Sequence, residues 1–213
     1  TFLPPIPFAR RMWAGGRIDT FHPIREHDQI LRRSAISALD RRDGKAGPFY
    51  LVSILHEIEA SGALALRERQ DLVFREGGAA ARGEPGAEVP HALSWSVEAS
   101  ATLLFRFSAL TFNGHRIHYD RDYATAVEKY PGLVVHGPLQ ALMLFEAARR
   151  RMPQRRPARF EFRGIRPLFD KDSLTLSGRS RSDGGMDLFT GTASGATGMQ
   201  AALHWQPDGS SHG

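Results

Sequence analysis

The residues most able to carry out chemistry lie in a short polar segment, residues 112–120. Two histidines stand three positions apart there, His115 and His118, close to Asn113. A third histidine, His136, follows later in the chain. Histidine has an ordinary pKa near neutrality, so it can take up and release protons at physiological pH. Acid–base catalysis is therefore one function that this spacing allows.

Two other interpretations compete with acid–base catalysis. Histidines in a polar loop often do no more than hydrogen-bond to the backbone, and they are also ligand types for metal ions. A metal site on His115, His118 and His136 is disfavoured, because no carboxylate sits at helical spacing from them. The pattern therefore predicts proton transfer that needs neither a metal nor another cofactor.

A helix is expected directly after the third histidine, over residues 137–151. It carries a broad apolar surface and ends in three arginines, where positive charge suits the helix dipole, and Pro153 stops it. Gly137 would open this helix and point backbone N–H groups at an anion. Such donors near His118 would stabilise negative charge on an oxygen atom of a reacting molecule.

Strand patterns occupy most of the remaining chain. We expect strands over residues 17–21, 30–39, 49–58, 64–74, 159–163, 174–179, 188–192 and 200–205, with hairpin turns at 41–45 and 183–185. The connecting residues should be extended and then turning over 93–104, irregular over 108–120, and helical over 122–130. Antiparallel strands with one long apolar helix predict an α+β fold, in which the sheet wraps around that helix.

Composition narrows the function classes. The chain has 213 residues, no cysteine and a formal net charge of +5. The lack of cysteine excludes disulfides, thiolate metal sites and a cysteine nucleophile. No apolar run has membrane-spanning length, and no helix-turn-helix, zinc-finger or aromatic–basic RNA motif supports a nucleic-acid partner. Arginine far outnumbers lysine, which would suit a partner that carries phosphate.

The polar segment and the helix start together resemble the MaoC-like hydratases, which have the hot-dog fold. The signature of that family runs Asp-x-Asn-Pro-[aliphatic]-His-x-Asp, and [aliphatic]-His-Gly then opens the central helix. Four residues agree with this frame, namely His118, Asp120, His136 and Gly137. Asn113 stands where the family has its catalytic Asp.

The departures from the signature resemble one subgroup of the family. His115 replaces the Asn and Arg116 replaces the Pro. Together with residues 104–111, this string looks like that of the mesaconyl-C4-CoA (3-methylfumaryl-CoA) hydratases, and it is similar to the fungal mitochondrial 3-hydroxyacyl-thioester dehydratases. Residues 3–7 and 10–16 fit the first half of these proteins, so the resemblance covers nearly the whole chain.

The resemblance implies water addition to, or removal from, a double bond beside a thioester carbonyl. His118 would be the general base, and the Gly137 N–H would bind the thioester oxygen. Asn113 cannot gain or lose a proton near neutrality, so we expect it to hold the water. The alternatives are that His118 makes both proton transfers, that His115 assists, or that Asp120 supplies a carboxylate.

Substrate contacts follow from the same resemblance, which implies an acyl thioester of coenzyme A or of acyl carrier protein. Arg116 is the candidate for the free carboxylate of a dicarboxylate substrate. Trp13 could line the acyl pocket, although a large aromatic residue is more often part of the core. The phosphates of the carrier could meet five arginines, although each alone is more typical of a solvated surface charge: Arg10, Arg11, Arg116, Arg163 and Arg166. His136 is a further supporting candidate in the site.

The subgroup is built as a double hot dog, which implies four segments here. These are a non-catalytic repeat (1–76), a linker (77–90), a catalytic repeat (91–206) and a flexible tail (207–213). The first repeat shows no long helix, so we expect its helix to precede Thr1. The resemblance also implies a homodimer, located in the cytoplasm of a bacterium or in the mitochondrion of a eukaryote.

Three rival functions remain open. A thioesterase of the same fold would be expected to have an acidic residue near the helix start, whereas residues 137–140 are uncharged. A non-catalytic module that binds acyl-CoA would tolerate Asn113 in place of the catalytic Asp. A purely structural partner in an oligomer would need none of these motifs.

Overall fold

The computed structural model describes residues 2–8, 10–44, 47–76, 93–193 and 195–207. The chain divides into two compact units. The first unit comprises residues 1–78, 154–163 and 203–213, and the second comprises residues 79–153 and 164–202. The expected linker at 77–90 and all but one residue of the expected tail lie outside the described residues.

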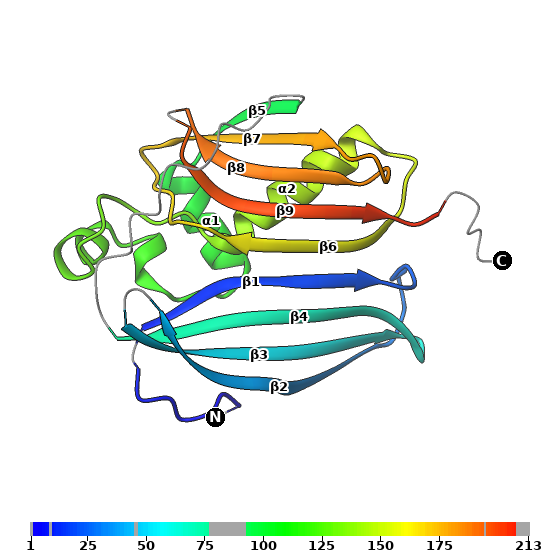
Figure 1. Cartoon of the computed structure of the whole chain (residues 1–213), viewed down its shortest axis with the longest axis horizontal. Helices are drawn as coiled ribbons and strands as arrows, with labels where there is room; N and C mark the ends of the chain where they lie inside the picture. Colours follow the sequence, from blue (N-terminus) through cyan, green and yellow to red (C-terminus); the bar gives the residue numbers. More distant parts are fainter. Residues whose placement is uncertain (1, 9, 45–46, 77–92, 194, 208–213) are drawn as a thin grey trace. The chain divides into compact units, whose positions relative to one another are not determined.

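The first unit is an antiparallel sheet in the order β2-β3-β4-β1-β6 (Figure 1). Its strands are β1 (Arg10–Thr20), β2 (Ile30–Gly44), β3 (Gly47–Ala60), β4 (Ala63–Arg75) and β6 (Pro157–Gly164). The turn between β3 and β4 has only two residues, Ser61 and Gly62, and both have positive φ angles of 48° and 87°. Such a turn matches the right-handed twist of the two strands that it joins.

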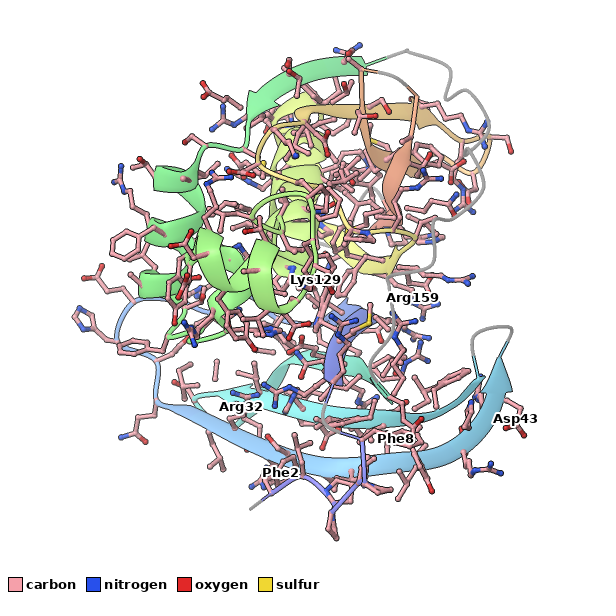
Figure 2. All side chains as sticks on the ribbon, turned by 90° about the vertical axis from the view of Figure 1, so that its left-hand side faces the viewer. Phe2, Phe8, Arg32, Asp43, Lys129 and Arg159 are labelled. Atoms are coloured by element: carbon pink, nitrogen blue, oxygen red, sulfur yellow. The ribbon has the colours of Figure 1, made fainter. Side chains whose placement is uncertain are left out.

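Strand β2 is longer than the sequence pattern indicates. A turn was expected from residue 41 onward, but residues 41–44 continue the ladder with β3, where Arg41 pairs with Tyr50 and Gly44 with Gly47. The core of this unit lies on β3 and β4, where Val52 and Leu72 are buried and Phe8 packs against them. Figure 2 labels Phe8 beside this sheet.

In its described residues, the second unit combines two helices, two short helical turns and four strands. The helices are α1 (Ala101–Leu110), the 3-10 turn η1 (Arg116–His118), the π-helical turn η2 (Tyr123–Val127) and α2 (Gly137–Arg151). The strands are β5 (Leu93–Glu98), β7 (Ser173–Ser180), β8 (Met186–Thr192) and β9 (Thr197–Trp205), in the order β9-β8-β7-β5. The last three residues of β9 count with the first unit.

Helix α2 contacts β7 and β8 and lies against one face of these strands (Figure 1). It buries Leu139, Leu144 and Ala148, whereas Leu142 is 55% exposed. Burial therefore covers one broad face of the helix. No helix in the described part of the chain is both long and apolar enough to cross a bilayer.

Helix α1 contradicts the expectation that residues 101–110 are extended, turning or irregular. Ser100 accepts a hydrogen bond from the Leu103 N–H at 3.3 Å and so caps the helix start. Leu104 and Ser108, one turn apart, are both buried. This ten-residue helix brings Ser108 to the site described next.

Candidate active site

The C-terminal turn of α1 sets the position of Asn113. Phe112 has a left-handed φ of 52° and its N–H donates to the Ala109 carbonyl at 3.3 Å, while the Asn113 N–H donates to the Ser108 carbonyl at 2.9 Å. These two bonds form a Schellman motif, which usually has glycine at the left-handed position. A bulky aromatic residue there is strained, and Phe112 is 97% exposed.

A compact loop connects Asn113 to His118. The Asn113 Oδ1 accepts a hydrogen bond from the His115 N–H at 3.1 Å, and the His118 N–H donates to the His115 carbonyl at 3.2 Å. Ile117 is buried and anchors the turn. Asn113 is half-buried and keeps its amide NH2 group for another partner.

His118 is buried, and its tautomer follows from its contact with Val134. The His118 Nδ1 lies 2.7 Å from the Val134 carbonyl oxygen. A carbonyl can only accept, so Nδ1 carries the hydrogen and Nε2 keeps its lone pair. Burial lowers the pKa of His118 to about 4, and the nearby His115 lowers it further, against the opposing effect of the bond to Val134. His118 is therefore a neutral base at physiological pH.

His136 lies flat on His118. The two ring centroids are 3.7 Å apart and the ring planes differ by 16°. His136 is fully buried, its Nε2 lies 2.9 Å from the Ser108 Oγ, and Phe107 contacts its ring edge-on. Burial lowers the pKa of His136 to about 3, and His118 adds to this effect.

Helix α2 begins at the residue after His136. Gly137 and Pro138 form its first two positions, and Gln140 donates its N–H to the His136 carbonyl at 3.1 Å. The first-turn N–H groups of a helix lack intrahelical acceptors, and Pro138 has no N–H. The Gly137 N–H is thus the donor of this turn nearest in sequence to the stacked rings, at the positive end of the helix dipole.

The other candidate residues in the loop have partners of their own. The His115 ring contacts His118 edge-on, with centroids 5.6 Å apart. Arg116 forms an ion pair with Asp120 at 2.7 Å and lies over the Tyr123 ring at 4.2 Å. The Tyr123 N–H and Arg116 lower the pKa of Asp120. Asp120 is therefore an ionised partner of Arg116 in this loop.

The remaining candidates are Trp13 and the arginines suggested for phosphate. Trp13 is in the first unit, where its ring stacks on Phe162 at a centroid distance of 4.9 Å. Of the five arginines suggested for phosphate, Arg10, Arg11 and Arg163 belong to the first unit, and Arg116 and Arg166 belong to the second. Among the described residues, no group of three or more His, Asp or Glu side chains is arranged to hold a metal ion.

Sequence reasoning missed Ser108 and the role of Val134. Ser108 was assigned to an irregular segment, although Ser100 followed by an apolar run was a signal for a helix start. Val134 acts through its backbone carbonyl, which no sequence pattern reveals.

Comparisons with known proteins find a matching family model and similar relatives. A family model described as hydroxyacyl-thioester dehydratase type 2 matches residues 1–170. The mesaconyl-C(4)-CoA hydratase of Chloroflexus aurantiacus is 43% identical over 205 residues, which are 95% of this chain and 72% of that protein. The mitochondrial hydroxyacyl-thioester dehydratase type 2 of Schizosaccharomyces pombe is 38% identical over 99 residues, 46% of this chain and 33% of that protein.

A solved structure supports the expected fold class. A Mycobacterium tuberculosis protein described as having a double hot-dog fold aligns with a TM-score of 0.60 at 14% identity. The alignment covers 93% of this chain and 75% of that one. The α+β double hot-dog prediction is therefore confirmed, as is the resemblance to the subgroup.

Proposed function

We propose that this chain, which belongs to the hydroxyacyl-thioester dehydratase type 2 family, reversibly adds water to an enoyl thioester. His118 is the base in this proposal. One observation carries this assignment. The stack of His118 on His136 sets a neutral imidazole beside the first residue of α2. A base and a set of oxyanion donors thus come from adjacent elements, as this chemistry requires.

His118 moves the protons in the proposed reaction. Its Nε2 takes a proton from water while the water oxygen bonds to the β-carbon of the substrate. The electrons of the double bond move to the thioester oxygen, which becomes enolate-like. The α-carbon then takes a proton from the imidazolium and the carbonyl re-forms, so that one water has been added. Dehydration follows the same steps in reverse.

Asn113 positions the attacking water, and Gly137 stabilises the charge on the thioester oxygen. The Asn113 amide holds the attacking water, because its NH2 group and one oxygen lone pair are available beside the bond to the His115 N–H. The Gly137 N–H donates to the thioester oxygen as negative charge develops there. One such donor commonly contributes about 3–4 kcal/mol to transition-state stabilisation.

The substrate we propose is 3-methylfumaryl-CoA (mesaconyl-C4-CoA), because the 43% identical relative is a mesaconyl-C(4)-CoA hydratase. Arg116 is the proposed contact for its free carboxylate. A 3-hydroxyacyl thioester of fatty-acid metabolism is the second candidate, since the family description names hydroxyacyl thioesters. The resemblance also predicts acyl carrier protein as an alternative thioester carrier and a homodimer. It predicts a cytoplasmic location in a bacterium or a mitochondrial one in a eukaryote.

The direct test follows the enoyl-thioester absorbance. Mesaconyl-C4-CoA and crotonyl-CoA are supplied separately to the wild-type chain, to His118→Ala and to His27→Asn. The last variant is a matched control, because His27 belongs to the first unit and its side chain is 89% exposed. We expect loss of signal with mesaconyl-C4-CoA for the wild type and the control, and none for His118→Ala.

Each other outcome has a definite meaning. Activity with crotonyl-CoA alone would move the substrate class to fatty-acyl thioesters. Equal activity in His118→Ala would contradict the role of His118 as base. No activity with either substrate, while both still bind, would favour the non-catalytic binding module.

A further inference from the structure

Two buried polar residues, Ser108 and His136, have no part in the proton transfers described above. His136 has no exposed surface and Ser108 is 5% exposed. Their side chains meet at 2.9 Å between the His136 Nε2 and the Ser108 Oγ. Burying two polar side chains is unfavourable unless they are paired, so this pair is a specific feature of the site.

We propose that Ser108 and His136 are positioning residues that hold the His118 ring and keep it neutral between turnovers. This inference rests on the proposed function, in which His118 is the base. His136 acts through its ring face, which covers one side of His118 at a centroid distance of 3.7 Å. Ser108 acts through His136, because its hydroxyl sets the rotation of that ring.

The second nitrogen of His136 indicates that this ring stays neutral. No described residue offers a hydrogen-bond partner to the buried His136 Nδ1. Protonation would give both ring nitrogens an N–H, and the one on Nδ1 would be buried without an acceptor, which is unfavourable. His136 therefore presents an uncharged ring face to His118. This face can stack on His118 both as a neutral imidazole and as an imidazolium.

Ser108 also connects the base to the water-holding residue. Its backbone carbonyl accepts the Asn113 N–H at 2.9 Å, while its side chain contacts His136. One residue near the end of α1 thus fixes Asn113 directly and His118 through the stack. A small displacement of either group would disturb the alignment that proton transfer needs.

The charged and titratable groups around the stack agree with this role. Burial has the largest effect on the pKa of both stacked histidines and lowers it. His115, on the η1 side of the loop, lowers both pKa values further. Arg116 and Asp120 neutralise one another through their ion pair. The segment before α2 contributes the Val134 carbonyl, and α1 contributes the uncharged Ser108 and Phe107.

The test removes one hydroxyl and leaves the backbone unchanged. Ser108→Ala deletes the contact to His136, and Thr111→Ala is the matched control. Thr111 follows the same helix, is exposed, and its hydroxyl donates to the Phe107 carbonyl at 2.7 Å. Ser108→Thr restores a hydroxyl at the buried position and tests for rescue.

We expect Ser108→Ala to lower kcat by about ten-fold to a hundred-fold with little change in KM, because ring alignment affects the chemical step more than binding. The acid limb of the kcat/KM profile should move up by about one pH unit, since a loosened stack weakens the burial that lowers the pKa of His118. Thr111→Ala should keep the wild-type profile, and Ser108→Thr should recover part of the activity. A Ser108→Ala enzyme that matches Thr111→Ala in kcat and in its acid limb would overturn the inference.

A second measurement needs no activity. Nitrogen-15 spectra of the histidine rings report the tautomer and the titration midpoint of His118 in the wild-type chain and in Ser108→Ala. We expect the midpoint to rise towards 6.5 in the variant. If it rises in a chain that hydrates no thioester, the positioning role stands and the proposed function fails; an unchanged midpoint contradicts the positioning role. Should Ser108→Ala not fold, His136→Gln provides the same comparison, because it removes the stacked ring and keeps a polar group facing Ser108.

Discussion

His118 and its neighbour Ile117 each form one hydrogen bond with the backbone of Val134. The Nδ1–H of His118 donates to the Val134 carbonyl at 2.7 Å, and the Val134 N–H donates to the carbonyl of Ile117 at 2.9 Å. The loop that carries the base is thereby fastened to the segment that leads into α2. This explains how a short irregular loop can hold a proton acceptor in a fixed direction.

Acidification should destabilise the protein through the stacked histidines. Burial lowers the pKa of His118 to about 4 and that of His136 to about 3, whereas the unfolded chain has the ordinary value of 6.5. The unfolded state then binds more protons below pH 6.5, so the contribution is complete above that pH and is lost as the pH falls towards 4. Urea titrations should show the free energy of unfolding falling by about 3 kcal/mol or more over this window.

The source of this pH dependence can be separated by substitution. Burial also lowers the pKa of His56 in the first unit, and this acts in the same direction. His118→Gln should reduce the pH slope of the unfolding free energy without abolishing it, because His136 and His56 remain. A wild-type unfolding free energy that is constant between pH 7 and pH 5 would contradict the prediction.

Replacing Phe112 should raise the stability of the protein and weaken substrate binding. Its φ of 52° is left-handed, and its side chain is 97% exposed beside Asn113. Glycine relieves the strain without loss of buried contacts, so Phe112→Gly should raise the free energy of unfolding by about 1 kcal/mol. We expect KM for the thioester to rise at the same time, since a strained aromatic residue at the site is kept for a contact with substrate.

Lys129 offers a matched control for Phe112. It is exposed and also left-handed, with a φ of 60°, and it is labelled in Figure 2. Lys129→Gly should raise the melting temperature in a similar way and leave KM unchanged. If Phe112→Gly keeps the wild-type KM as well, Phe112 has no role in substrate binding.

A buried pair supports the first turn of α2. Thr190 on β8 donates its hydroxyl to the Gln140 Oε1 at 2.6 Å, and both residues are buried. Thr190→Val keeps the shape but leaves that oxygen unsatisfied, which should cost about 1–3 kcal/mol of unfolding free energy in urea titrations. The double variant Gln140→Leu, Thr190→Val should recover part of this loss. A single variant no less stable than the double one would refute the pairing.

The long helix was predictable because its ends are marked in the sequence. Gly137–Pro138 suits a helix start and Pro153 prevents continuation, and the predicted range of residues 137–151 is confirmed. Helix α1 was missed because its surface has no clear polar face: Phe105 and Leu110 are 59% and 78% exposed. Periodicity gives little signal when apolar residues lie on both sides of a helix.

The sequence indicates which residues belong to the candidate site better than it indicates how those residues contact one another. The spacing of motif residues named His118, His136 and Gly137 from the sequence. The stacking of two rings that are eighteen positions apart depends on how the loop meets the start of α2, and the pattern does not encode it. Ser108 was missed for the same reason, since its contact to His136 exists only after α1 has packed.

Arg116 should distinguish substrates that carry a second carboxylate. Two of its N–H groups bind the Asp120 Oδ2 at 3.0 and 2.7 Å, and the side chain is 56% exposed. A guanidinium has five N–H donors, so others can meet a substrate carboxylate while Asp120 and Tyr123 hold the group in place. Arg116→Gln should raise KM for mesaconyl-C4-CoA by about ten-fold or more and leave that for crotonyl-CoA nearly unchanged.

Arg106 on α1 provides the control, because it is an exposed arginine of the same unit. Arg106→Gln removes the same charge, so any general effect on the attraction of an anionic thioester appears in both variants. The difference between them isolates the direct contact. Steady-state kinetics with both thioesters at two salt concentrations complete the comparison, since a contact within the site is screened less than a surface charge. An equal rise in KM for both substrates in Arg116→Gln would mean that Arg116 binds the carrier phosphates or only stabilises its loop. The free carboxylate would then be bound by a residue other than Arg116.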